Sequence, residues 1–356
     1  MTINNLLILV LKQFRLILFI PLFLILNSEL RAQDIHFSQY YNSPLLLNPA
    51  RTGNFDGDYR AGLNYRNQWS AFVPFAWYSG FAEMKMGGEL FGGDGLAFGL
   101  MFFGDKTGTA QIGTQTFGPT VGYQKKLDEA GKHIISSGLG ITYVQKSFNK
   151  DGLQFPNQFE GTSFIEGREN GESLASNSFS YMDFHAGISH NFIFNEKLSF
   201  ETGISLFHLT KPVESFWGDK SNRLNRRLSF STGATYILNE KVQILPGILY
   251  MGQAKDSDMM IGSNVRYNLK STAVKNTAVR FGGWYRIGDS FVLFTGLDYN
   301  EYQFGFSYDA TLSSLNNANK SIGAFEFSLI YIYGKGAKLP TRTTMPCKRL
   351  IDKPLY

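Results

Sequence analysis

Apolar and polar positions alternate with a period of two through most of the chain from Asp58 onward. In the stretch DYRAGLNYRNQW, Tyr59 and Leu63 share one face, and Arg60 and Arg66 share the other. This period is typical of strands whose two faces meet different surroundings. About fourteen such segments of roughly ten residues follow one another, with no comparable signal of helical period. An even number of strands of this length predicts an all-β fold, an antiparallel β-barrel of the bacterial outer-membrane type.

The composition of the two faces favours a barrel in lipid over a soluble sandwich. Charged residues share a face with Gly, Ser, Thr and Asn, while the opposite face carries Phe, Tyr, Ile, Leu and Met. A wet lumen and a lipid-facing exterior fit this division, whereas a sandwich would turn its apolar face inward. Aromatic residues near strand ends suit the two membrane interfaces. We expect there Trp69, Phe72, Trp77, Tyr331 and Tyr333.

Loop lengths give an independent indication. The fifth connection, roughly residues 147–178, is the longest, and the seventh and the last are also long, whereas the even connections FNEK and LNEK are tight turns. Such alternation is expected of a barrel with both chain ends in the periplasm, because external loops are longer than periplasmic turns. Pro119 and Pro246 cannot donate to a strand ladder and are expected at bulges.

Residues 1–32 have the order of a secretory signal peptide. Basic residues precede an apolar run from Leu16 to Leu26, and the small residue Ala32 stands before Gln33. The run is shorter than the about 20 residues that a membrane span needs, so cleavage is favoured over an uncleaved anchor. The chain is therefore predicted to be exported.

The net charge of +5 is concentrated at the C-terminal end. Residues 335–356 hold six basic residues against Asp352 alone, together with three prolines. They predict an extended basic tail on the periplasmic side, and the charge does not indicate a nucleic-acid-binding face. The tail is either solvated or a tether to an acidic periplasmic component. Cys347, the only cysteine, has no partner for an internal disulfide.

The stretch HFSQYYNSPLLLNPARTGNF, between the signal peptide and the first strand, is dense in aromatic and aliphatic residues. Pro44 and Pro49 keep the chain extended or bent, and Asn48 with Pro49 starts a turn. So many apolar side chains argue against a disordered leader. A barrel of this strand number would otherwise enclose an aqueous channel. We therefore expect residues 33–57 to pack into or across the barrel as a plug.

Residues that could support catalysis or metal binding are scattered. The five histidines, at positions 36, 133, 185, 190 and 208, show no pair at metal-ligand spacing on a helix. Asp183 and His185 share a strand face, but lumen faces are polar in any case, and a site needs a nucleophile or a metal as well. Gly138 and Gly140 lie inside a strand and are expected to admit large neighbours or to bend the wall. We predict no enzyme, no metal and no cofactor.

The segment SLFHLTKPVESFWGDKSNRLNRR places aromatic residues on a loop that should be wet. His208 and Leu209 end a strand, Pro212 fixes the exit, and Phe216 and Trp217 follow. Two interpretations remain open. The loop folds back so that its aromatics are buried against the barrel rim, or it forms an external contact surface for another protein.

Four stretches resemble the PorP/SprF family of type IX secretion system membrane proteins: QYYNSPLLLNPARTGNF, GISLFHLTKPVESF, FGFSYDATLSSL and GAFEFSLIYIYG. The resemblance runs from about Gln33 to Gly334. It implies an outer-membrane barrel of Bacteroidetes-type bacteria, associated with the type IX translocation or gliding machinery. Some members serve the secretion or surface attachment of one large cell-surface protein. The residues that match its signatures are Asn48, Pro49, Ala50, Gly53, His208, Leu209, Pro212, Phe216, Tyr308 and Asp309.

The sequence thus predicts a signal peptide (1–32), a plug (33–57), a barrel (58–334) and a basic periplasmic tail (335–356). We expect a non-enzymatic component of the type IX machinery in contact with outer-membrane lipid, other type IX components and a large secreted surface protein, and with no nucleic acid. The alternative is a transporter of hydrophobic compounds resembling the long-chain fatty acid channels, whose N-terminal hatch also carries an Asn-Pro-Ala pattern. A transporter should show a continuous apolar path and a lateral opening, and a scaffold should show a filled lumen and a protein-binding rim.

Overall fold

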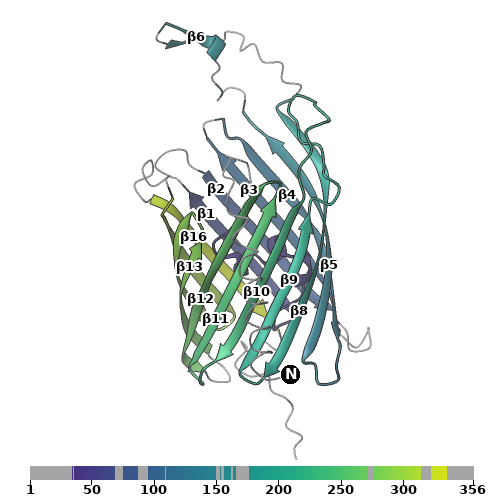
Figure 1. Cartoon of the computed structure of the whole chain (residues 1–356), viewed down its shortest axis with the longest axis vertical. Coiled ribbons are helices and arrows are strands. Elements are labelled where there is room, and N and C mark those ends of the chain that lie inside the picture. The colour runs from purple at the N-terminus through teal and green to yellow at the C-terminus, as the bar shows by residue number, and fades with distance from the viewer. Residues whose placement is uncertain are drawn as a thin grey trace, which may run out of the picture.

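Fourteen antiparallel strands close into one barrel (Figure 1). The structure is a computed structural model that describes residues 34, 36–68, 75–86, 95–108, 110–149, 153, 156–161, 163–165, 176–271, 276–313 and 322–334. Each strand pairs with its neighbours in chain order, and the first strand closes the barrel on the last, from Tyr59 opposite Tyr333 to Gln68 opposite Ala324. The predicted fourteen-stranded barrel is confirmed.

The barrel strands have the following bounds: β1 Tyr59–Gln68, β2 Phe75–Met86, β3 Gly95–Thr107, β4 Gly113–Lys126, β5 His133–Ser147, β8 Ser178–Asn195, β9 Leu198–Phe207, β10 Arg227–Ile237, β11 Val242–Gln253, β12 Asp256–Ser271, β13 Asn276–Arg286, β14 Ser290–Tyr299, β15 Tyr302–Thr311 and β16 Ile322–Tyr333. A two-stranded hairpin, β6 Phe159–Glu160 and β7 Ser163–Phe164, belongs to the connection between β5 and β8 and stands apart from the barrel in Figure 1.

The two ends of the barrel differ in their connections. One end carries the connections β5–β8 and β9–β10, and we call it the long-loop end. The other carries the tight turns β8–β9 and β10–β11, and we call it the short-turn end. β1 begins and β16 finishes at the short-turn end, since Tyr59 and Tyr333 lie opposite each other there. The connections β5–β8, β9–β10 and β15–β16 lie at the long-loop end, as predicted, but β11–β12 at the same end is also a tight turn.

Side chains alternate between the lumen and the outer wall, as the period of two requires. On β16 the buried Glu326 and Ser328 face inward, whereas Phe327 is 49% exposed on the outside. Leu139 on β5 is 65% exposed. An outer wall of exposed large apolar side chains suits lipid, and the inward positions hold the polar groups. Among the described residues, no helix is long and apolar enough to cross a membrane.

Two local expectations are wrong. Trp77 faces the lumen and is buried, because the odd positions of β2 point inward; it lies under the Arg66 guanidinium at 5.2 Å from the ring centroid. Pro119 and Pro246 interrupt the ladders β4–β5 and β10–β11, but the register is the same on both sides, so neither forms a register-shifting bulge. Trp69, Phe72, the signal peptide and the basic tail with Cys347 lie outside the described residues.

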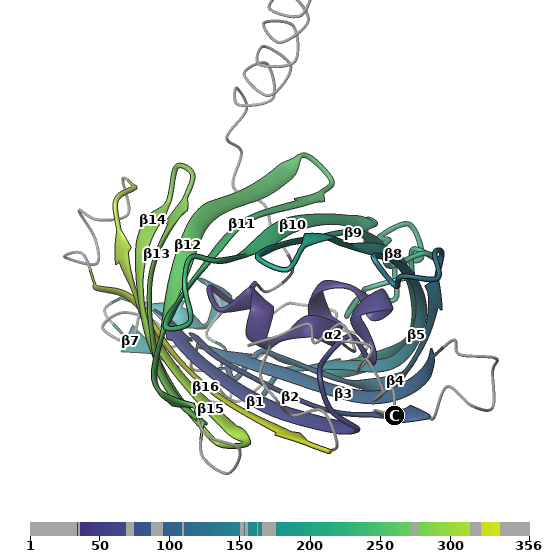
Figure 2. The ribbon, with the colours of Figure 1, turned by 90° about the horizontal axis from the view of Figure 1, so that it is seen from below.

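The residues before β1 lie inside the ring of strands (Figure 2). We call residues 34–57 the N-terminal segment. It forms the short helices η2 Tyr40–Asn42, α2 Pro44–Leu47 and η3 Pro49–Arg51. Pro44 and Pro49 each open a helical turn, where a missing N–H costs nothing. The segment starts near Gln253 at the long-loop end, where Asp34 N donates to Gln253 Oε1 at 2.9 Å, and reaches β1 at the short-turn end.

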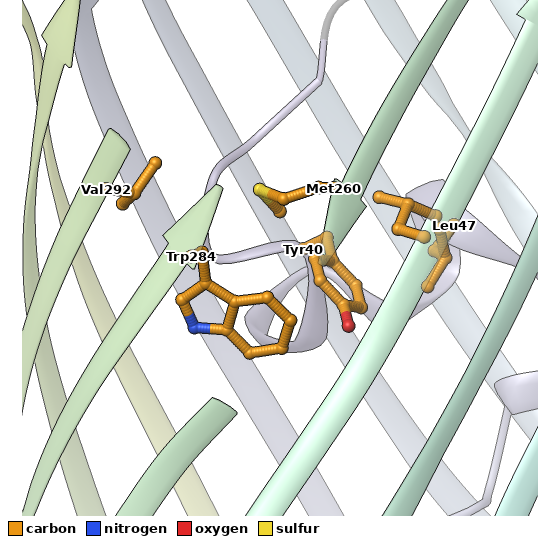
Figure 3. Packing of buried hydrophobic residues seen from close by; sticks show 6 residues of the cluster. Tyr40, Leu47, Met260, Trp284 and Val292 are labelled. Atoms are coloured by element: carbon orange, nitrogen blue, oxygen red, sulfur yellow. The ribbon is translucent and has the colours of Figure 1, made fainter. Parts of the chain in front are cut away.

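Three apolar clusters fix the N-terminal segment against the inner wall. Tyr40 and Leu47 pack with the wall residues Leu249, Met260, Trp284 and Val292 (Figure 3). Leu45 packs against Phe81, Met101 and Ile330, and Phe37 packs against Trp77 and Phe103. The core of the molecule therefore lies between the N-terminal segment and the barrel wall.

Candidate functional site

At the long-loop end, His208 joins the N-terminal segment to the wall. Its Nδ1 lies 2.5 Å from Asp183 Oδ2 and its Nε2 lies 2.5 Å from Asp34 Oδ2. Arg227 Nη1 approaches the same Asp34 oxygen at 3.3 Å. The backbone of His208 has a φ of 57°, a conformation that residues other than glycine rarely adopt. We call Asp34, Asp183, His208 and Arg227 the His208 latch.

The charges of the His208 latch support one another. Burial alone would lower the pKa of His208, but the Asp34 and Asp183 carboxylates outweigh it and raise the pKa to about 9. Burial alone would raise the pKa of Asp34, but His208 and Arg227 hold it below its usual range. The imidazole is therefore protonated at neutral pH and donates from both nitrogens, so it bridges two carboxylates.

Further into the lumen, Glu326 on β16 binds the backbone of the N-terminal segment. Its two oxygens accept from the N–H groups of Ser38 and Gln39 at 2.8 and 2.9 Å. Arg66 lies 3.3 Å from Glu326 and 2.8 Å from Asp309, and Ser38 Oγ donates to Asp309 at 2.7 Å. Since Arg66, Asp309 and Glu326 are all buried, each charge depends on the others and on the segment.

The Asn-Pro-Ala signature sits on a row of glycines. Gly122, Gly138 and Gly187 lie opposite one another on β4, β5 and β8, and with Gly203 on β9 they form what we call the glycine cradle. A Cβ atom on Gly138 would lie 2.2 Å from the carbonyl carbon and oxygen of Pro49. Only glycine admits the segment so close to the wall.

Asn48 is anchored on both sides of its amide. Its Oδ1 accepts from Ala50 N at 2.8 Å, and its Nδ2 donates to the carbonyl oxygens of Ile188 and Ile204 at 3.1 and 3.2 Å. Gly53, near the short-turn end, has a φ of 78° and donates its N–H to Glu83 at 2.8 Å. The predicted residues Asn48, Pro49, Ala50 and Gly53 thus form one contact zone with the wall.

The residues of the central signature and the neighbouring Trp217 differ in how far they are buried. Pro212 is buried, Leu209 N donates to Phe184 O at 3.1 Å, and the Phe216 ring lies edge-on to Phe148 at 4.8 Å. Trp217, the next residue, is 60% exposed. Phe216 thus folds back onto the rim, whereas Trp217 faces outward.

The two residues of the late signature, Tyr308 and Asp309, are consecutive in β15 and therefore point to opposite faces of the wall. Asp309 points into the lumen and belongs to the Arg66 cluster. Tyr308 lies on the outer wall, 37% exposed, opposite Phe325 of β16. The structure therefore does not bring Tyr308 together with the other signature residues.

The contacts of Arg66, Glu326 and Asp34 within this site were not predicted from the sequence. A signal existed for the first two, because each is a charged residue on the inward face of an otherwise apolar or aromatic strand. Asp34 has no such pattern around it, since it precedes the first strand. Its role depends on a histidine 174 positions away.

One arrangement has the residue types of a hydrolase. Thr142 Oγ1 lies 2.9 Å from His185 Nε2, and His185 Nδ1 lies 3.7 Å from Asp183 Oδ2. Thr142 is fully buried, and Asp183 is already bonded to His208 at 2.5 Å. In the described part of the chain, no group of three or more His, Cys, Asp or Glu side chains is placed to hold a metal ion. This cluster is a bonding network in the wall.

A family model described as "Type IX secretion system membrane protein PorP/SprF" matches residues 29–331. A search of curated protein sequences finds no match.

Among solved structures, the toluene transporter TbuX of Ralstonia pickettii has a TM-score of 0.49 at 8% identity, over 81% of this chain and 92% of that chain. A FadL homologue of Pseudomonas aeruginosa has 0.47 at 10% identity, over 82% and 94%. BamA from Haemophilus ducreyi lacking POTRA domains 1–3 has 0.40 at 12% identity, over 78% and 70%.

The family match covers most of the chain, and the closed antiparallel barrel is the β-architecture that crosses a membrane with no open sheet edge. The chain is therefore an outer-membrane β-barrel and belongs to the PorP/SprF family of type IX secretion system membrane proteins.

Proposed function

We propose that the protein is a non-enzymatic component of the type IX secretion or gliding machinery that acts in the secretion or surface anchoring of a large partner protein. The observation that carries the proposal is Trp217, which is 60% exposed beside the packed Phe216. Exposed tryptophan on a fixed support is the kind of residue on which protein interfaces concentrate their binding energy.

The loop that carries Trp217 is braced from several sides. Val213 bridges to Arg223 within the loop, and Glu214 accepts from Lys146 at 2.6 Å and from Tyr181 at 2.5 Å. A loop that is already ordered loses little entropy when a partner binds. The long-loop end corresponds to the cell exterior in barrels of this kind, so the braced loop would face a surface protein.

We also propose that the N-terminal segment closes the lumen. The lumen contains ion pairs such as Arg266 with Asp298 at 2.7 Å and Arg60 with Glu83 at 2.6 Å. Charged pairs along the inner wall favour a scaffold over a transporter, which needs a continuous apolar path. In planar bilayers we expect a silent intact protein and a conducting protein without residues 34–57. Equal conductance of the two would remove the plug from the proposal.

The proposed partner contact is tested in cells with the variant Trp217→Ala and the matched variant Phe230→Ala, an exposed aromatic residue on the outer wall. Both should reach the outer membrane in folded form. Trp217→Ala should lower the amount of type IX surface protein retained on cells by about tenfold, which corresponds to about 1.4 kcal/mol. Retention equal to that of wild type, with normal barrel assembly, would contradict the proposal.

A further inference from the structure

The barrel wall holds the N-terminal segment by its backbone as well as by its side chains. Glu326 and Glu83 accept from N–H groups of the segment, at 2.8–2.9 Å, and Ser205 donates to Leu47 O at 2.7 Å. In the described part of the chain, side chains from six strands bond to main-chain atoms of the segment: Asn64, Glu83, Lys85, Ser205, Arg227, Gln253 and Glu326. Main-chain groups are the same in every polypeptide, so these bonds supply affinity with little dependence on sequence.

The inner wall also carries apolar recesses among its polar groups. Trp284, Phe81 and Phe103 each belong to a different cluster, filled from the segment by Tyr40 with Leu47, by Leu45 and by Phe37. A lumen built only to hold water would be polar at these positions. Backbone-directed bonds combined with side-chain recesses are the two parts of a peptide-binding site.

The two ends of this site are unequal. Asp34 lies at the long-loop end with a quarter of its side chain exposed, whereas the Asn48 region is enclosed by the glycine cradle. The His208 latch is therefore the more accessible end of the segment. The braced loop with Trp217 belongs to the same end of the barrel.

We propose that the lumen is a binding channel for a polypeptide segment, and that residues 34–57 are its resident ligand, exchanged for a segment of the secreted partner. This rests on the proposed function, which supplies the partner. The fitting segment, like residues 34–57, is bent into short helical turns and carries few charged residues. It has large apolar side chains at the spacing of the three clusters and a small residue or an Asn-Pro turn over the glycine cradle.

The test uses the purified full chain in detergent and a fluorescent synthetic peptide with the sequence of residues 34–57. In the full-chain variant Asn48→Ala with Leu45→Ala, the resident ligand is weakened while every wall residue is unchanged. The peptide should bind this variant at least about tenfold more tightly than it binds the wild-type chain, because the tethered competitor is weaker. The single variant Asn48→Ala serves where the double variant does not fold, as judged by heat-modifiable migration.

A scrambled peptide and a peptide with the same two substitutions are the matched controls, and both should bind poorly. Adding Gly138→Val to the weakened chain should abolish binding, since that side chain fills the cradle. If a folded variant binds the native and scrambled peptides equally, the N-terminal segment is a fixed internal core and the inference fails. That outcome leaves the partner contact at Trp217 untouched, because the peptide assay contains no secreted partner.

Discussion

The two halves of the N-terminal segment are held in the lumen by different forces. From Asp34 to Gln39, the bonds run to buried charges, notably His208 and Glu326. From Leu45 to Gly53, close packing is added, with Pro49 against Gly138 and the Asn48 amide between two strands, besides the Arg51–Glu201 ion pair at 2.7 Å and the bond from Gly53 N–H to Glu83. Charge-based attachment depends on protonation, whereas close packing does not. The comparison suggests one end that can be released and one that determines position.

We expect the largest loss of stability from a substitution that breaks the charged contacts of the first half of the segment, from Asp34 to Gln39. Replacing Glu326 by Ala leaves Arg66 buried beside one carboxylate fewer and leaves the N–H groups of Ser38 and Gln39 without their acceptor. We expect a loss of about 3–5 kcal/mol in the free energy of unfolding, as for other buried charges stripped of a partner. Urea titration of the folded, heat-modifiable band measures it.

Glu196→Ala, at the exposed β8–β9 turn, is the control and should change stability by less than about 0.5 kcal/mol. If both variants lose equally little, the buried cluster does not hold the segment.

The close packing of the second half of the segment, from Leu45 to Gly53, can be tested by adding a single methyl group to the wall. Gly138→Ala would place a Cβ atom 2.2 Å from the Pro49 carbonyl, whereas a Cβ on Gly95 of β3 would meet nothing closer than 3.7 Å. We expect Gly138→Ala to lose about 1–3 kcal/mol through overpacking and Gly95→Ala to lose much less. Limited proteolysis should also cut the N-terminal segment faster in the first variant. Identical protection of the segment in both would show that the cradle does not seat Pro49.

The pH dependence separates the two halves. The folded-state pKa of His208, about 9, lies above its ordinary value of 6.5. The stabilisation from this group is therefore fully present below about pH 6.5 and is lost as the pH rises through about 9. Proteolysis near Asp34 should accelerate between pH 7 and 10, while the Asn48 region stays protected. The effect is smaller than the preceding ones because Asp34 is partly exposed and solvent screens it.

His208→Gln should remove most of this acceleration, since the glutamine side chain does not titrate. A wild-type profile that is flat from pH 7 to 10 would contradict the role of the latch.

The last experiment should barely change stability. It uses cysteine labelling to determine which end of the barrel, and so which half of the N-terminal segment, lies near the cell exterior. In a Cys347→Ser background, Lys220→Cys lies at the long-loop end and Glu196→Cys at the short-turn end, both at exposed positions. An impermeant maleimide added to intact cells should label the first and not the second. Stability should change by less than about 0.5 kcal/mol in either. The reverse labelling pattern would show that the long-loop end, with the His208 latch, lies on the periplasmic side.

Much of the barrel could be predicted from the chain because its signals are local. The alternation in DYRAGLNYRNQW or FEFSLIYIYG assigns each side chain to a face before any partner strand is known, since neighbouring residues in a strand point to opposite sides. The lengths of the connections then indicate which end of the barrel carries the long loops and which carries the tight turns. The inward placement of Asn64, Arg66 and Glu326 follows from that period alone.

The site needed contacts between distant parts of the chain. Ser38 and Glu326 are 288 positions apart, and Trp77 could be assigned to the membrane interface until its lumen neighbours Phe37 and Arg66 were known. Likewise, the contact between Gly138 and Pro49, and the difference in burial between Phe216 and Trp217, are visible only in the closed barrel. The sequence by itself determined the strands, their faces and the order of the connections, because each depends on a few consecutive residues. The tertiary structure decided what fills the lumen and which aromatic residue stays exposed, because these depend on the register of fourteen strands around a segment that belongs to none of them.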